Sequence, residues 1–141
     1  MSEQDALYRQ CMREVIELHD FFQAWLEGSA PQTESVFRRF TDVNDPAFLL
    51  IGPHGRAIDL SAARRWIWEA WNTRPNSRLW TEAHTLRYST TEMAVMTYHE
   101  LQLNDGAPNQ RLSTVVFRQD PAAPNGLVWV HVHETWMETE R

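Results

Sequence analysis

The sequence predicts an α+β fold in which three N-terminal helices pack on a strongly curved, mainly antiparallel sheet. Two observations lead to this prediction. In the first half of the chain, apolar residues recur at steps of three and four, the spacing that places them on one face of a helix. In the second half, four segments rich in valine, threonine and aromatic residues are separated by short polar turns. Because the chain has 141 residues, we expect one domain that spans positions 1–141.

The first predicted helix covers positions 5–27 and ends at Gly28. Its apolar residues form one stripe, which contains Leu7, Cys11, Val15, Leu18, Phe22 and Leu26. Cys11 is the only cysteine of the chain, so neither an internal disulfide nor a cysteine-built zinc site can form. Its place in the stripe predicts a buried, inert thiol.

Two shorter helices are predicted to follow. Thr33 can cap a short aromatic helix, which the Asp-Pro pair at positions 45–46 stops. Asp59 or Ser61 can cap a third helix over positions 62–71. The three helices together supply the apolar faces that a sheet needs as its cover.

The predicted strands form a hairpin and a meander. Residues 48–51 and 56–59 flank a Gly-Pro-His-Gly sequence that favours a tight reversal. The four later strands are expected at positions 79–90, 93–104, 111–119 and 127–137. Consecutive strands joined by short turns pair in antiparallel fashion.

The composition excludes several classes of function. The formal net charge is −6, whereas nucleic-acid binding needs clustered cations, so no nucleic-acid partner is expected. All 13 basic residues are arginine, which excludes Schiff-base catalysis by lysine. No apolar segment approaches the roughly 20 residues of a membrane span, so no membrane partner is expected. The N-terminal residues show no basic leader with an apolar core, and we therefore expect a cytoplasmic protein.

Three passages of the sequence resemble the nuclear transport factor 2-like superfamily, specifically its SnoaL-like branch. AWLEG, before a short aromatic helix, is similar to the family's opening, and FLLIGPHGRAID resembles its hairpin ahead of the third helix. WVHVHETW resembles the closing strand, which often carries His-x-His followed two residues later by Ser or Thr. In this chain those positions are His131, His133 and Thr135. The closing strand, with RLSTVVFRQD before it, is also similar to the association domain of calcium/calmodulin-dependent protein kinase II.

The resemblance implies a cone-shaped fold with a pocket between the helices and the concave side of the sheet, and usually a homodimer formed through the sheet. The superfamily includes isomerases, cyclases, dehydratases, hydrolases, ligand binders and non-catalytic assembly domains, so the fold alone assigns no reaction. We expect a small, partly apolar organic molecule as the ligand of the pocket. Any catalysis there is expected to be acid–base chemistry without a cofactor. The alternative is a non-catalytic oligomerisation module.

His131 and His133 are the first candidates for proton transfer. Because residues i and i+2 of a strand point to the same side, the two imidazoles project together. A catalytic zinc usually has three protein ligands, and no His-Glu-x-x-His or comparable spacing is present, so no metal site is predicted. One positioned histidine or carboxylate suffices for proton transfer. The predicted catalytic residues are His131, His133, His84, Glu82 and Glu100.

Aromatic and basic side chains complete the predicted pocket. Tryptophans suit its walls, tyrosines can donate hydrogen bonds, and arginines can hold an anionic group. The predicted ligand-binding residues are Trp25, Trp66, Trp80, Tyr88, Tyr98, Arg111 and Arg118.

The strand faces decide between the two functional hypotheses. If the valines that alternate with the histidines, at positions 128, 130 and 132, face the core, then His131 and His133 belong to an interface. A shift of one residue in a strand register exchanges every pocket residue for its neighbour. His19 on the first helix is open to either a packing or a functional role.

Overall fold

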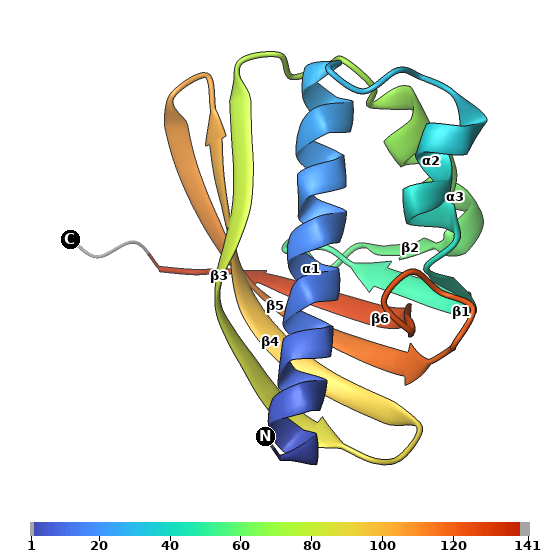
Figure 1. Cartoon of the computed structure of the whole chain (residues 1–141). Helices are drawn as coiled ribbons and strands as arrows, with labels where there is room; N and C mark the ends of the chain where they lie inside the picture. The colour runs from blue at the N-terminus through green and yellow to red at the C-terminus, as the bar shows by residue number, and fades with distance from the viewer. Residues whose placement is uncertain (1, 139–141) are drawn as a thin grey trace.

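The computed structural model describes residues 2–138 and contains three helices and six strands (Figure 1). In chain order they are α1 (Glu3–Glu27), α2 (Glu34–Thr41), β1 (Asn44–Ile51), β2 (Ala57–Asp59), α3 (Leu60–Glu69), β3 (Ser77–Ser89), β4 (Met93–Asn104), β5 (Ala107–Gln119) and β6 (Leu127–Trp136). The order of elements and the α+β class are those that the sequence predicts.

Local signals in the sequence fix the ends of the helices. Ser2 and Asp5 form a reciprocal capping box at the start of α1, and Thr33 and Asp59 cap α2 and α3. Gly28 ends α1 in the left-handed conformation, with φ at 80°. A β-carbon at Gly28 would also collide with the side chain of Asn72, so glycine is required there on two grounds.

The six strands form one sheet in the order β2-β1-β6-β5-β4-β3. Neighbouring strands are antiparallel except β1 and β6, which pair in parallel. The predicted hairpin of β1 and β2 and the predicted meander from β3 to β6 are both present. β5 starts earlier than predicted, because Asp105 and Gly106 make a two-residue turn in which both φ angles are positive.

The helices cover one side of this sheet (Figure 1). α1 crosses the concave side and packs mainly against β3, while α3 packs on β1. The core between these layers is apolar and strongly aromatic. Its fully buried members include Cys11, Val15, Trp25, Val43, Met96, Val115, Phe117 and Leu127. Burial also raises the pKa of the Cys11 thiol to about 12, which agrees with the inert thiol predicted from the helical stripe.

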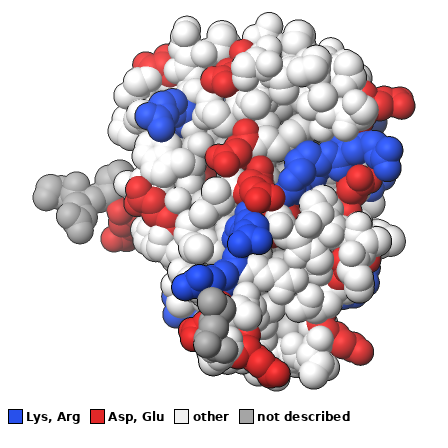
Figure 2. Space-filling model, in the orientation of Figure 1, with Lys and Arg blue, Asp and Glu red and all other residues white. Residues whose placement is uncertain are grey.

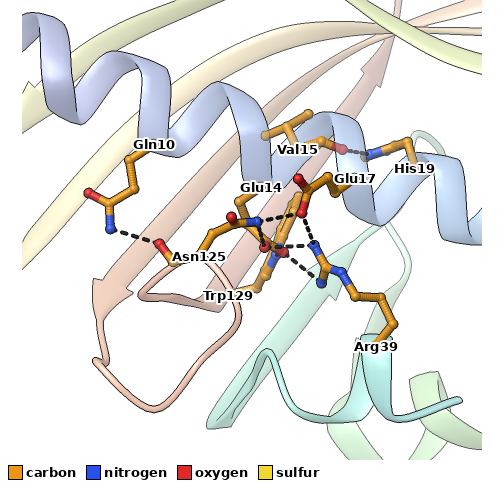
Figure 3. A network of polar contacts seen from close by, with 8 residues as sticks. All are labelled: Gln10, Glu14, Val15, Glu17, His19, Arg39, Asn125 and Trp129. Atoms are coloured by element: carbon orange, nitrogen blue, oxygen red, sulfur yellow. Dashed lines mark hydrogen bonds and ion pairs between the residues drawn. The ribbon is translucent and has the colours of Figure 1, made fainter. Parts of the chain in front are cut away.

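A buried carboxylate ties three parts of the fold together (Figure 3). Glu14 on α1 is fully buried and accepts two hydrogen bonds from the guanidinium of Arg39 on α2, at 2.8 and 3.2 Å. It also accepts from the indole of Trp129 on β6, at 2.8 Å, and from the amide of Asn125 in the preceding loop, at 3.0 Å. These contacts hold Trp129 in place on the concave side of the sheet.

Charged side chains of both signs lie next to each other on the face that α1 covers (Figure 2). On the face in view, the charges do not gather into a large patch of a single sign. None of the helices within residues 2–138 combines the length and the hydropathy that a membrane crossing requires.

Candidate functional site

A cavity of about 140 Å³ lies between the helices and the concave side of the sheet. Most of its wall is apolar and includes Leu18, Phe22, Phe40, Leu50, Ile67 and Val132. The polar part of the wall is formed by His19, Tyr98, Glu100, Gln102, Arg111 and Glu134. Trp66, which is 49% exposed, and the exposed Arg74 also line the cavity, so they mark where it meets solvent.

The register of the sheet brings the polar side chains together. Directly paired residues of antiparallel strands project from the same side of a sheet. Glu100 on β4 pairs with Arg111 on β5, and Ser113 on β5 pairs with both Tyr98 and Glu134. His19 reaches the same cluster from α1. The cluster therefore combines side chains that are up to 115 positions apart in the sequence.

His19 and Glu100 share one proton in a buried hydrogen bond. Nδ1 of His19 lies 2.7 Å from the backbone oxygen of Val15, which can only accept, so Nδ1 carries a hydrogen. Nε2 of His19 lies 2.9 Å from Oε1 of Glu100. The pair is thus either imidazolium with carboxylate or neutral imidazole with carboxylic acid, and its net charge is zero in both forms.

The surroundings favour the ionised form of this pair. Burial alone would lower the pKa of His19, but the hydrogen bond and the negative charge of Glu100 outweigh burial and raise it. Burial alone would raise the pKa of Glu100, but the hydrogen bond and positive charge of His19, followed by Arg111 and Gln102, hold it below its ordinary value. The side-chain amide of Gln102 donates to Oε2 of Glu100 at 2.6 Å.

Glu134 is a second buried carboxyl group with weaker support. Its Oε2 lies 3.5 Å from Nη1 of Arg111, longer than the roughly 2.7 to 2.9 Å of a charge-assisted hydrogen bond. Burial raises the pKa of Glu134 to about 7, the charge of Glu100 adds to this shift, and Arg111 and His19 oppose it. Glu134 can therefore gain or lose a proton near neutral pH.

Arg111 completes the cluster, but the cluster does not provide a hydrogen-bond acceptor for every N–H of its guanidinium. Its Nε lies 3.5 Å from Oε2 of Glu100, and within residues 2–138 this buried nitrogen has no hydrogen-bond partner. The guanidinium also lies over the ring of Trp136, 4.7 Å from the ring centroid. Stacking holds the plane of the guanidinium, whose contacts to Glu100 and Glu134 are both long, at 3.5 Å.

Four residues of the sequence-based site prediction line the cavity, namely Glu100, Trp66, Tyr98 and Arg111. The phenol of Tyr98 is fully buried, and burial raises its pKa well above the ordinary value. Tyr98 is therefore a hydrogen-bonding group throughout the physiological range.

Five predicted residues point to the opposite, convex side of the sheet: His131, His133, Glu82, Trp80 and Tyr88. On β6, the pairing shifts between Val116 and Phe117 of the partner strand and leaves Val130 as an extra residue. This bulge reverses the alternation, so Trp129, Val132 and Glu134 line the cavity. His131 instead lies 2.9 Å from the backbone oxygen of Leu49 through its Nδ1.

The other three predicted residues, His84, Trp25 and Arg118, do not line the cavity. His84 stacks on Tyr98 and lies 2.8 Å from the hydroxyl of Thr81; burial first, and then the charge of His19, lowers its pKa. Trp25 belongs to the aromatic core, and its indole donates to the backbone oxygen of Ile67 at 2.7 Å. Arg118 forms an ion pair with Asp45 at 2.8 Å.

The catalytic and ligand-binding residues predicted from the sequence include neither His19 nor Glu134, although both line the cavity. His19 follows Val15 by four positions and precedes Phe22 by three, so helical spacing alone places it beside the buried stripe. Glu134 carried no such signal. Alternation along β6 puts it on the side opposite to the histidines, but without the bulge at Val130 the sequence does not tell which of the two sides faces the cavity. Within residues 2–138, no group of three or more His, Cys, Asp or Glu side chains is arranged to hold a metal ion.

Comparison with protein families gives one match over most of the chain. The family described as the C-terminal part of sucrose-6-phosphate phosphohydrolase matches residues 11–138. That segment includes every residue of the polar cluster.

Solved structures share the fold. A nuclear transport factor 2-like protein of unknown function from Pseudomonas aeruginosa is 26% identical, with 92% of this chain and 99% of that chain covered and a TM-score of 0.82. The association domain of the calmodulin-dependent kinase CaMKII from C. elegans is 15% identical, with 93% and 96% covered and a TM-score of 0.67. A ketosteroid isomerase, assigned as such only provisionally, from Parabacteroides distasonis is 15% identical, with 72% and 76% covered and a TM-score of 0.55. The nuclear transport factor 2-like fold predicted from the sequence is confirmed.

Proposed function

The chain belongs to the sucrose-6-phosphate phosphohydrolase C-terminal family, and on this premise we propose that it binds a small, partly apolar organic molecule in the cavity between α1, α3 and the sheet. One observation carries the proposal. The cavity wall is apolar over most of its area, and its polar part gathers titratable and hydrogen-bonding groups in one cluster. Pockets that orient small ligands combine an apolar wall with a few polar groups in this way.

The size of the cavity limits the ligand. An apolar cavity of roughly 150 Å³ holds a molecule of the size of benzene, and the cavity described here has about 140 Å³. Pockets for larger ligands measure roughly 300 Å³ or more. Sucrose 6-phosphate, which the family name mentions, is a phosphorylated disaccharide covered with hydroxyl groups, and a mostly apolar wall offers these groups few hydrogen-bond partners. The proposed ligand is therefore smaller and more apolar.

The polar cluster supports acid–base chemistry at the ligand. Glu134 can exchange a proton near neutral pH, while Arg111 and Tyr98 can hydrogen-bond to a carbonyl or hydroxyl oxygen. The ion pair of His19 and Glu100 supplies fixed charges around the reacting group. Isomerisation or dehydration of a small carbonyl compound needs groups of this kind and no cofactor. In this proposal Glu134 exchanges the proton, a role for which the sequence had suggested other residues.

Filling the cavity tests the proposal. Ala70 lines the cavity from the end of α3, so Ala70→Phe should occupy the space of the ligand. We expect benzamide, a neutral probe with one benzene ring, to bind saturably to the natural protein and at least about tenfold more weakly to this variant. Calorimetry measures both affinities. Ala62→Phe is the matched control, since Ala62 lies on the same helix but does not line the cavity, and its affinity should stay within about twofold. Equal binding to all three proteins, or no binding, would contradict a ligand site in the cavity.

We further propose that two copies of the chain associate through the convex side of the sheet. The exposed or half-buried residues on this side include Val95, Thr97, His99, Leu112, Thr114 and Val116. His131 and His133 project next to Val116 and Thr114, respectively. A mixture of aliphatic side chains and histidine is compatible with a subunit interface. The cavity opens on the other side of the sheet, so association and ligand binding do not compete.

A further inference from the structure

Two arginine–glutamate contacts in this protein differ in geometry. Arg39 binds Glu14 through two nitrogens, at 2.8 and 3.2 Å, and forms the saturated pair of Figure 3. Arg111 approaches Glu100 and Glu134 no closer than 3.5 Å, and its buried Nε has no hydrogen-bond partner within residues 2–138. The first contact completes the fold. The second leaves in the cavity wall a guanidinium whose contacts to both neighbouring carboxyl groups are long.

The charges around Arg111 define what it can bind. His19 from α1 and Arg111 from β5 are the positive groups that face Glu134, and Glu100 from β4 is the negative one. Tyr98 also lies in the cluster, and its raised pKa keeps it neutral. His84 stacks on Tyr98, and Arg74 lines the cavity where it meets solvent. When Glu134 is ionised the cluster is neutral, and when Glu134 is protonated the cluster carries one positive charge. Only the protonated cluster is matched to a ligand with one negative charge.

A protonated Glu134 also changes the hydrogen-bond inventory of the cavity. Its carboxyl group can then donate a hydrogen bond, as the guanidinium of Arg111 does. One donor group from β5 and one from β6, both in the wall of the cavity, can pair with the two oxygens of a carboxylate. A cation meets the positive charges of His19 and Arg111, and a neutral amide binds beside the neutral cluster without gaining an ion pair.

From this geometry we propose that the ligand is a small carboxylate with one negative charge and an apolar body, which Arg111 binds while Glu134 takes up one proton from solvent. The inference rests on the function proposed above, because it names the chemical class of the ligand in the same cavity. The apolar wall accepts the body of the ligand, and the carboxylate pairs with the guanidinium. Glu134 is then the proton donor in the complex.

Benzoate and benzamide test this inference, because they have nearly the same shape and differ in charge. Benzoate stays ionised between pH 6 and 9, so a change of its affinity in this range reports the protein. We expect benzoate to bind at least about tenfold more tightly than benzamide at pH 6, and its affinity to fall close to tenfold for each pH unit above about 7. Calorimetry in buffers of different ionisation enthalpy should give uptake of nearly one proton per benzoate at pH 8.5 and none for benzamide.

Three variants separate the roles of the side chains. Glu134→Gln keeps the shape but cannot ionise, so benzoate should bind it with the same affinity at pH 6 and 8.5, and more than about tenfold more tightly than the natural protein at pH 8.5. Arg111→Met should lose at least about tenfold in benzoate affinity and keep that for benzamide within about threefold. Arg118→Met is the control, because Arg118 lies on the same strand and pairs with Asp45 outside the cavity. Circular dichroism checks that each variant is folded.

The binding measurements distinguish a failure of the carboxylate inference from a failure of the proposed function. Equal affinity for benzoate and benzamide, or benzoate binding without proton uptake, would overturn the carboxylate inference and leave the ligand cavity intact. Failure of both probes to bind would contradict the proposed function itself.

Discussion

Glu14 and Glu134 are both buried carboxyl groups, and their neighbours give them different roles. Glu14 accepts four hydrogen bonds, from Arg39, Trp129 and Asn125, and two of the four come from a charged group. Glu134 has one long contact to Arg111, and burial raises its pKa to about 7. A carboxylate with every acceptor site occupied stabilises the fold. A carboxyl group with free acceptor sites in a cavity can exchange its proton with a ligand.

Replacement of Glu14 tests the structural role. Each oxygen of Glu14 accepts one hydrogen bond from Arg39 and one from another donor, so in Glu14→Gln the amide group turns two hydrogen bonds into contacts between donors. Arg39 also loses its buried anionic partner. Breaking a buried ion pair typically costs about 3 to 5 kcal/mol, and we expect the free energy of unfolding to fall by about 3 kcal/mol. Urea unfolding measures it.

Glu17 provides the matched control for this measurement. It lies one turn further along α1, is half exposed, and approaches Arg39 only to 3.7 Å. Surface pairs of this kind contribute about 0.2 to 1 kcal/mol. If Glu17→Gln and Glu14→Gln lower the free energy of unfolding equally, the network of Figure 3 does not hold α1, α2 and β6 together.

At the level of elements, helices followed from the sequence more reliably than strand faces. The period of α1 is uninterrupted over 25 residues, so its buried stripe could be placed from Leu18 and Phe22 alone. β6 keeps its strand pattern throughout, but the extra residue Val130 reverses which side chains face the helices. Because side chains alternate with a period of two, this one bulge places Glu134 at the cavity, where the sequence predicted His133.

β3 carries a similar irregularity. Its pairing with β4 shifts between Glu82 and Thr85, and Ala83 there has a φ of 55°, a left-handed value. No glycine, asparagine or aspartate marks this position in the sequence, so the signal that normally predicts such a conformation is missing. The shift turns His84 toward Tyr98, whereas Trp80 and Glu82 lie on the convex side. On the regular strand β4, Tyr98 and Glu100 both line the cavity, as the sequence predicts.

At the level of the whole molecule, the two proposed functions, ligand binding and association, lie on opposite sides of the sheet. The concave side, under α1, carries the cavity with its polar cluster. The convex side presents aliphatic residues and histidines to solvent in the single chain. The aliphatic residues and histidines on the central strands of that side suit the proposed contact with a second copy of the chain.

Leu112 lies on the convex side of β5 and is 36% exposed. Leu112→Glu would place two like charges in a symmetric interface, so we expect the dimer to dissociate at micromolar concentration. Sedimentation velocity measures the mass. Ile16→Glu is the control, since Ile16 on α1 is 38% exposed and lies on the helical side of the molecule. A natural protein that sediments as a monomer would contradict the proposed association.

The most direct test of the central claim is a crystal structure of the protein soaked with benzoate at a concentration that saturates binding in solution. We expect the phenyl ring between Phe22 and Ile67, and the carboxylate within hydrogen-bonding distance of the Arg111 guanidinium and of the Glu134 carboxyl group. Benzoate bound only outside the cavity, or a cavity without benzoate at that concentration, would contradict it.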